Sequence, residues 1–311
     1  MSLANFTILN TYTGIKTHQS VYSDGTNIWT TNAGNSTTSS GLYRYNMTPT
    51  LLTSNNDAAD DITGAEDDVW QMNGIEKIAG KLYIGAMNFP NGNDSSLHNA
   101  GDKYQRSYIT RWDPTTLAYE AKWAVGDSSV LGPSAVARWT EGCAYHEGTG
   151  HLFVIFHGNE VAEEYSFDGS GDLVFVARHT FPSVDNTNQG ANFLNSRGFE
   201  DITFSGDTCW LNRHAATSDP YFYEFKWNGS GFDFVQKIAR LGDDFTQGVN
   251  IQPGTNITWW CERTTSGGDT EGSISKVISR GLDLSGRVGV GLSFETTGVK
   301  YADSSGIIVS K

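Results

Sequence analysis

Cysteine, proline and charge are scarce in this sequence, and each shortage excludes a class of protein. The three cysteines, Cys143, Cys209 and Cys261, lie far apart inside apolar runs, so they exclude a disulfide framework and a zinc site and predict buried, reduced thiols. No apolar run approaches the roughly 18 residues of a membrane-spanning helix. With only 7 prolines and no Pro-rich, Ser-rich or charge-rich linker, we expect a single domain over residues 1–311.

Basic residues are also few. The chain has 21 Lys and Arg against 35 Asp and Glu, which gives a net charge of −14. A field of this sign repels phosphate groups, so nucleic acid and an anionic membrane surface are excluded as partners. The first residues, Met1–Asn5, carry neither the basic nor the apolar part of a signal peptide, and we expect folding in a reducing cytoplasm.

Common catalytic and metal-binding motifs are missing. The sequence contains no GxSxG elbow, P-loop, HExxH pair or strand-linked GxGxxG. The acidic stretch Asp57–Asp68 offers oxygen ligands to calcium but lacks EF-hand spacing, so a solvated acidic loop is the favoured interpretation and calcium the alternative. We therefore expect neither a metal nor a cofactor.

Glycine and aromatic residues are abundant, and they follow a repeat. The chain has 35 Gly, 9 Trp, 13 Tyr and 16 Phe, a composition that favours tight turns and pleated strands. In five places a polar residue, a small residue or Asp, and an apolar residue precede a turn and then an aromatic residue. These openings are Gln19-Ser20-Val21, Asn73-Gly74-Ile75, Glu141-Gly142-Cys143, Glu200-Asp201-Ile202 and Gln247-Gly248-Val249. Each opening and its turn predict a β-hairpin.

Two further strands follow each hairpin, and the openings recur every 47 to 68 residues. This spacing predicts an all-β fold, a five-bladed β-propeller of four-stranded antiparallel blades. The blades are expected to start near residues 19, 73, 141, 200 and 247. In the fifth blade we expect 274–280 as the third strand and 287–294 as the fourth, with 1–18 and 299–311 as closing or arm segments that remove sheet edges. A β-sandwich or a β-helix is the alternative fold.

Propeller geometry converts the repeat into a predicted site. The first strand of each blade lines the central channel and the second runs back antiparallel to it, so the starts of the first strands and the ends of the second strands share one face. The expected ligand-binding residues are Gln19, Asn73, Glu141, Glu200 and Gln247 from the strand starts, and Asn32, His157, Arg213 and Glu262 from the strand ends. The long loops leave from the same face; they are 33–41, 89–107, 214–220 and 264–273.

Convergent polar groups beside Trp and Tyr favour a pocket for a small ligand or a glycan. The alternative is that these groups only order water and cap the strand starts. Glu141 and Glu200 belong to adjacent blades, and a carboxylate pair at a suitable separation acts as acid and base in glycoside cleavage. An enzyme that acts on a glycan or a peptide terminus through this pair is therefore the alternative function.

Short stretches resemble two propeller families. Phe245–Val249 is similar to the opening motif of bacterial and plant glutamine cyclotransferases, which are five-bladed, although Cys143 stands where that family has an aromatic residue after Glu-Gly. Thr17–Val21, Asn27–Thr30 and Leu42–Tyr45 resemble the propeller units of phage receptor-binding and tail proteins. The second resemblance implies a virion protein that folds in the cytoplasm and works outside the cell.

We therefore expect a non-enzymatic recognition or structural propeller, a phage-type tail or head appendage whose loop-rich face binds a glycan or a neighbouring virion protein. A homo-oligomer fits this role, because such appendages are usually symmetric, and membrane insertion does not. A purely structural subunit whose channel mouth binds nothing is a second alternative.

Overall fold

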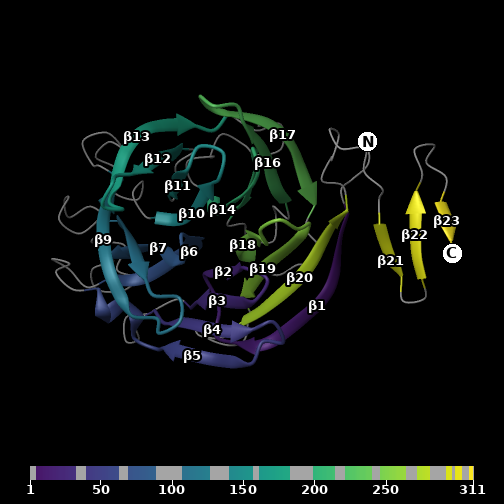
Figure 1. Ribbon diagram of the computed structural model, residues 1–311, viewed down its shortest axis with the longest axis horizontal. Helices are drawn as coiled ribbons and strands as arrows, with labels where there is room; N and C mark the ends of the chain where they lie inside the picture. The colour runs from purple at the N-terminus through teal and green to yellow at the C-terminus, as the bar shows by residue number, and fades with distance from the viewer. Residues whose placement is uncertain are drawn as a thin grey trace, which may run out of the picture.

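Five antiparallel four-stranded sheets surround a central axis, which makes the protein a five-bladed β-propeller (Figure 1). The structure is a computed structural model and describes residues 5–32, 40–62, 69–88, 107–126, 140–156, 161–182, 199–213, 221–239, 246–263, 272–280, 292–295, 298–302 and 308–310. The helical content of these residues is the 3-10 helix η1 (Ala58–Asp61). No helix in the described ranges is long and apolar enough to cross a membrane.

In blades 1 to 4 the strands follow chain order from the axis outwards. Blade 1 contains β2 (Ser20–Ser23), β3 (Asn27–Thr31), β4 (Leu42–Asn46) and β5 (Leu51–Asn55). Blade 2 contains β6 (Val69–Ile78), β7 (Lys81–Asn88), β8 (Ser107–Trp112) and β9 (Tyr119–Val125). Blade 3 contains β10 (Thr140–His146), β11 (His151–Phe156), β12 (Val161–Phe167) and β13 (Leu173–Thr180). Blade 4 contains β14 (Phe199–Ser205), β15 (Thr208–Arg213), β16 (Tyr221–Trp227) and β17 (Phe232–Ala239).

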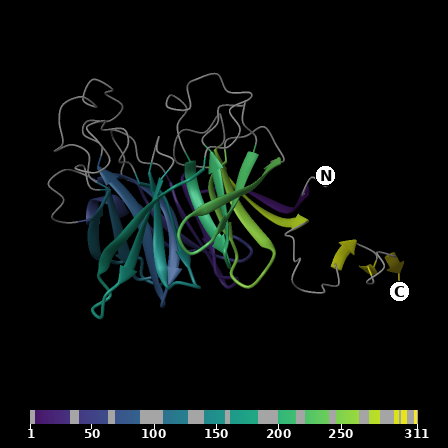
Figure 2. The same ribbon diagram turned by 90° about the horizontal axis from the view of Figure 1, so that it is seen from above.

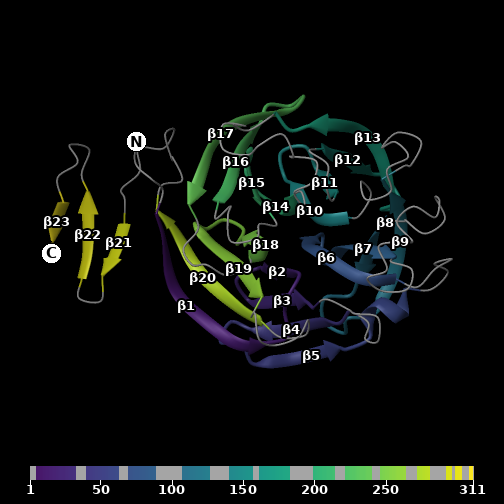
Figure 3. The same cartoon turned by 180° about the vertical axis from the view of Figure 1, so that it is seen from behind.

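The N-terminal strand completes the fifth blade. Blade 5 contains β18 (Thr246–Ile251), β19 (Ile257–Arg263), β20 (Gly272–Arg280) and, outermost, β1 (Asn5–Ile15). β1 runs antiparallel to β20, with Ile8 opposite Val277, so the two ends of the propeller share one sheet (Figures 1 and 3).

The prediction that 287–294 would be the fourth strand of this blade is wrong. β21 (Leu292–Glu295) pairs with β22 (Gly298–Ala302), and β22 with β23 (Ile308–Ser310), in a separate three-stranded sheet. The physical reason is length: the 11 residues of β1 cover the 9 residues of β20, whereas β21 has only 4. The longer strand leaves less of the edge of β20 unpaired.

The inner strands approach one another most closely at the second position of the repeat. We call Ser20, Gly74, Gly142, Asp201 and Gly248 the small-residue ring. A Cβ atom at Gly142 would lie 2.8 Å from the Cα of Asp201, and one at Gly248 would lie 2.6 Å from the Cα of Ser20. A Cβ at Gly74 would meet Gly142 in the same way, at 2.6 Å, and Gly74 has a φ of +65° besides. Backbone therefore packs on backbone from blade to blade.

The two members of the ring that have side chains use them to bind the next blade. The backbone N–H of Gly74 donates to the hydroxyl of Ser20, and the N–H of Val249 donates to Asp201 Oδ2 at 3.0 Å. Asp201 also accepts from the N–H of Ile202 at 2.9 Å. The ring thus joins each inner strand to the following one, either by close contact or by a hydrogen bond.

Farther from the axis, bulky side chains fill the wedge between the blades. Each of the five interfaces between blades holds its own cluster of buried apolar residues. Trp29, Trp210 and Trp259 lie in these clusters and are at most 1% exposed. The three cysteines are buried and free, as predicted. Small residues inside and aromatic residues outside give each interface its wedge shape.

Replacing Gly142 by Ala is expected to lower the free energy of unfolding by about 1–3 kcal/mol, because the added methyl group is forced against the backbone of blade 4. Urea unfolding measures the loss. Gly169→Ala is the matched control, since no atom lies within 4 Å of a Cβ at Gly169. Its effect should stay between zero and a gain of about 1 kcal/mol. Equal stability of the two variants would show that the ring is not tightly packed.

Truncation separates the roles of the two ends. Deleting residues 1–15 removes β1 and exposes the edge of β20, so we expect loss of cooperative thermal unfolding and aggregation. Deleting residues 287–311 removes β21 to β23 and should leave a cooperative transition. Calorimetry on both proteins tests the assignment, which the reverse outcome would contradict.

Candidate functional site

The loop-side ring, which we define as Gln19, Asn73, Glu141, Glu200 and Gln247, was the predicted site. The side chains of the first four are all buried, and none is more than 5% exposed. Gln247 lies in β18, but its side chain lies outside the described part of the chain. The predicted residues therefore gather near the axis, but the four described side chains are internal.

Two members of the loop-side ring bind each other across a blade boundary. The Nδ2 of Asn73 in β6 donates to Glu141 Oε2 in β10 at 2.8 Å and to the carbonyl oxygen of Thr140 at 3.4 Å. The Oδ1 of Asn73 accepts from Gln71 Nε2 at 3.1 Å. Gln19 contacts His18 Nδ1 at 3.4 Å. These contacts satisfy buried polar groups and tie blade 2 to blade 3.

The strand ends give a similar picture where they are described. Asn32 is buried; its side-chain oxygen accepts from the N–H of Gly41 at 2.6 Å, and its carbonyl oxygen accepts from Ser40 Oγ at 2.8 Å. His157 lies outside the described residues, as do the side chains of Arg213 and Glu262. The greater part of each predicted long loop is also outside the described ranges; these segments are 33–39, 89–106, 214–220 and 264–271.

No metal site is found in the residues that the structure describes. They contain no group of three or more His, Cys, Asp and Glu side chains placed to hold a metal ion. In the acidic stretch predicted as a solvated loop, residues 63–68 are outside the description. The described half forms η1, where Asp61 Oδ2 accepts from Asn55 Nδ2 at 2.6 Å.

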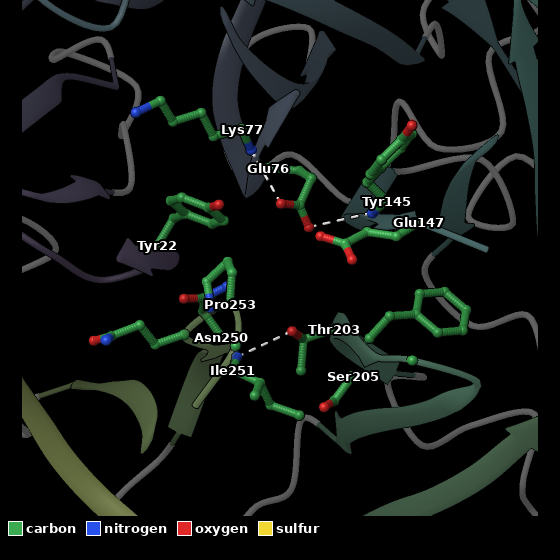
Figure 4. A pocket seen from close by; sticks show the side chains of 14 residues that line it. Tyr22, Glu76, Lys77, Tyr145, Glu147, Thr203, Ser205, Asn250, Ile251 and Pro253 are labelled. Atoms are coloured by element: carbon green, nitrogen blue, oxygen red, sulfur yellow. Dashed lines mark hydrogen bonds between the residues drawn. The ribbon is translucent and has the colours of Figure 1, made fainter. Parts of the chain in front are cut away.

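On the face opposite the loop-side ring, tight turns join the first and second strands of each blade (Figure 2). A pocket opens on this face (Figure 4). We call it the hairpin-side pocket; its volume is about 110 Å³. All five blades contribute to its wall. The lining residues are Tyr22, Glu76, Lys77, Tyr145, Glu147, Thr203–Gly206 and Asn250–Gly254.

Side-chain alternation explains why polar groups line this pocket. Residues two apart on a strand face the same way, so the side chains two positions after the small-residue ring point towards the neighbouring blade. Glu76, Thr203 and Asn250 occupy this position, and each accepts the backbone N–H of a residue on the next blade. The respective donors are Tyr145 at 3.2 Å, Ile251 at 3.1 Å and Ser23 at 2.9 Å. The blades are thus tied together a second time at this level.

Glu76 is the most perturbed acid of the pocket. Its side chain is only 9% exposed, and its carboxyl group accepts from the N–H groups of Tyr145 and of Lys77, the latter at 3.0 Å. Burial raises the pKa of Glu76 from 4.5 to about 8, and the nearby carboxylate of Glu147 adds to the rise. Burial, followed by the charge of Glu76, raises the pKa of the Tyr22 phenol. The site therefore favours a protonated Glu76 at neutral pH.

The lysine in the wall does not neutralise this acid. Lys77 Nζ forms an ion pair with Asp24 and lies 4.9 Å from the ring centre of Trp29. Figure 4 shows its amine directed away from the carboxyl group of Glu76. Glu76 and Glu147 thus face the same cavity without a cation between them in the described structure.

The hairpin-side pocket was not among the predicted sites. The predicted repeat ends at its third position, the apolar Ile75, one residue before Glu76. One signal was available: continuing the alternation puts Tyr22, Glu76, Thr203 and Asn250 in equivalent positions. The alternation predicts that these four side chains lie at the same level of their blades. It does not predict how wide the space between them is.

Comparison with known proteins supports no function. No family model and no curated protein matches the chain. Three solved structures resemble it: a luciferin-regenerating enzyme (TM-score 0.46, 9% identity, 87% of this chain and 93% of that one), the calcium-binding protein regucalcin from Agrobacterium tumefaciens strain C58 (0.46, 10%, 86% and 93%), and a putative 6-phosphogluconolactonase from Bacteroides fragilis NCTC 9343 (0.45, 9%, 93% and 81%). Similarity this low transfers no activity to this chain. None of the three is a phage protein, so the phage resemblance gains no support from them.

The raised pKa of Glu76 predicts a pH-dependent stability. A group whose folded-state pKa exceeds its unfolded value stabilises the fold fully below the unfolded pKa and loses this contribution as pH rises through the folded pKa. The window for Glu76 therefore runs from 4.5 to about 8. Across it, wild-type stability should fall relative to that of Glu76→Gln by up to about 1.4 kcal/mol per pH unit. Urea unfolding at about pH 5 and about pH 8.5 measures the difference.

Asp168→Asn is the matched control. Asp168 lies in an exposed turn, where the N–H groups of Asp172 and Ser170 lower its pKa. The pH dependence of stability that Asp168 itself causes therefore lies below the pH range of Glu76. Asp201, whose pKa burial raises, contributes with the same sign to all three proteins. Parallel profiles for wild type and Glu76→Gln would show that Glu76 does not titrate in this range.

Proposed function

We propose that this protein is a non-enzymatic recognition propeller, a rigid ring that presents its loop face to a glycan or to a neighbouring protein. The finer form of the proposal is a phage-type virion appendage, a component of a tail or head, working outside the cell after folding in the cytoplasm. It rests on the likeness of Thr17–Val21 and Leu42–Tyr45 to units of such proteins. Assembly as a symmetric homo-oligomer belongs to the same proposal.

The observation that carries the non-enzymatic part is the hydrogen bond between Asn73 and Glu141. A general acid or base has to reach the proton that it transfers. Glu141 is 4% exposed, and one of its oxygens accepts from Asn73 Nδ2. This arrangement supports a carboxylate that holds two blades together rather than one that meets a substrate.

Recognition of a sugar usually needs an aromatic face that water can reach. Most tryptophans do not offer one, since six of the 9 are buried between blades. These six are Trp29, Trp112, Trp210, Trp227, Trp259 and Trp260. Trp70 and Trp139 precede Asn73 and Glu141 in the sequence by only three and two positions. Trp139 and the side chain of Trp70 lie outside the described part of the chain, and we propose both residues as contacts at the loop face.

Variants of Glu141 and Glu200 distinguish recognition from the alternative function, an enzyme that uses these two residues as acid and base. We expect Glu141→Gln and Glu200→Gln to keep binding on a glycan array at the wild-type level, since neither side chain is exposed. We expect Trp70→Ala and Trp139→Ala to weaken binding by roughly tenfold each, as befits the loss of an aromatic contact worth about 1.5 kcal/mol.

Glu120→Gln serves as control for the Glu→Gln change, because Glu120 lies in β9 and pairs at the surface with Lys81 and Arg111. If wild type cleaves a glycan or peptide and both loop-side variants lose the turnover while the control keeps it, the protein is an enzyme. If wild type binds no glycan at high concentration, recognition of glycans is excluded and a protein partner remains.

A further inference from the structure

The two acids of the hairpin-side pocket have no cationic partner among the residues that the structure describes. Glu76 and Glu147 line it, and the partners of the Glu76 carboxyl group are two backbone N–H groups and the phenol of Tyr22, all neutral. The nearest cation along the chain, Lys77, pairs with Asp24 instead. A net charge of −14 on the whole chain adds to the attraction for a cation from solution.

The size of the pocket limits what can enter. Its volume of about 110 Å³ exceeds the roughly 10–15 Å³ that one water requires and stays below the roughly 300 Å³ of the smallest pockets for drug-sized ligands. A sugar ring with its neighbours is too large, whereas an ammonium group on a short alkyl chain fits.

The lining favours an organic cation over a metal ion. Calcium takes about six to eight oxygen ligands, and the described residues contain no group of three or more potential metal-binding side chains. Tyr22 adds aromatic surface beside the two acids, whereas the ring of Tyr145 points away from them, as Figure 4 shows. Aromatic rings attract ammonium and guanidinium groups, and carboxyl groups accept their hydrogen bonds.

We propose that the hairpin-side pocket binds a primary ammonium group, with Glu76 and Glu147 as its anionic partners and Tyr22 beside it. The ammonium belongs either to a free small amine or to the lysine side chain of a protein partner. This site lies on the face opposite the proposed recognition surface, so it is independent of that function.

Binding has a chemical consequence at Glu76. The pKa of this acid is about 8, so at neutral pH it is mostly protonated before the amine arrives. The ammonium stays protonated, Glu76 loses its proton to the buffer, and an ion pair forms. The groups that face Glu76 and share in this balance are Tyr22, Lys77, Glu147 and, from blade 4, Asp201.

Calorimetric titration with n-butylammonium chloride tests the proposal. At neutral pH, in buffers with different enthalpies of ionisation, wild type is expected to release close to one proton for each amine bound. Affinity should rise between about pH 6 and about pH 8.5, as Glu76 becomes easier to ionise. Glu76→Gln should release no proton, and Glu147→Gln should weaken binding by about 10- to 100-fold, as expected for losing a charged hydrogen bond.

Controls separate this site from others. Glu120→Gln should bind like wild type, and neutral n-butanol should not bind. Acetyl-lysine-amide, with its free side-chain ammonium, distinguishes the sources: binding tighter than that of n-butylammonium points to a protein lysine, and weaker binding to a free amine.

The proposal is overturned if wild type binds no amine at about 100 mM, if n-butanol binds equally well, or if Glu147→Gln changes nothing. Binding of glycan by Glu147→Gln at the loop face should be unaffected, so either idea can fail alone.

Discussion

The close approach of the five inner strands is the constraint on which the rest of the structure depends. At the small-residue ring the backbone of one blade touches the backbone of the next, as a Cβ at Gly142 or Gly248 would lie under 3 Å from a neighbouring Cα. Where a side chain is present, at Ser20 and Asp201, it is short and accepts an N–H from the next blade. The narrow centre lets larger side chains fill the wider space outside it.

The same narrow centre buries the polar side chains near the axis, so each of them needs a hydrogen-bond partner. A buried polar group without a partner costs about 1–3 kcal/mol, so Asn73, Thr203 and Asn250 all bind groups of a neighbouring blade. A polar residue at a channel mouth is therefore weak evidence of a binding site in this fold. Glu76 also accepts an N–H of the next blade, but burial raises its pKa and the described residues place no cation beside its carboxyl group, which makes it more informative.

The features of the fold that depend on residues close together in the sequence were predicted correctly. Turn residues and strand alternation located the hairpins of all five blades, and the radial arrangement then followed from the repeat. Closure was recovered only as an alternative: 1–18 and 299–311 were both expected as closing or arm segments, and the pairing of Ile8 with Val277 shows that the N-terminal segment closes the ring. This pairing joins opposite ends of the propeller, so no local pattern decides between the two segments. The exposure of Glu141 and the opening beside Glu76 depend on the radius of the ring, which no short segment encodes. The hairpin-side pocket could therefore not be predicted from the sequence.

Closure by the first strand also sets an order of events during synthesis. β1 leaves the ribosome before any blade, but its partner β20 ends at Arg280. At about 5–20 residues per second, β1 waits on the order of tens of seconds for that partner. Ile8 and Leu9, still more than 40% exposed in the finished propeller, are uncovered throughout this time. A nascent chain of this kind is exposed to chaperones and to pairing with its own copies until the last blade has emerged.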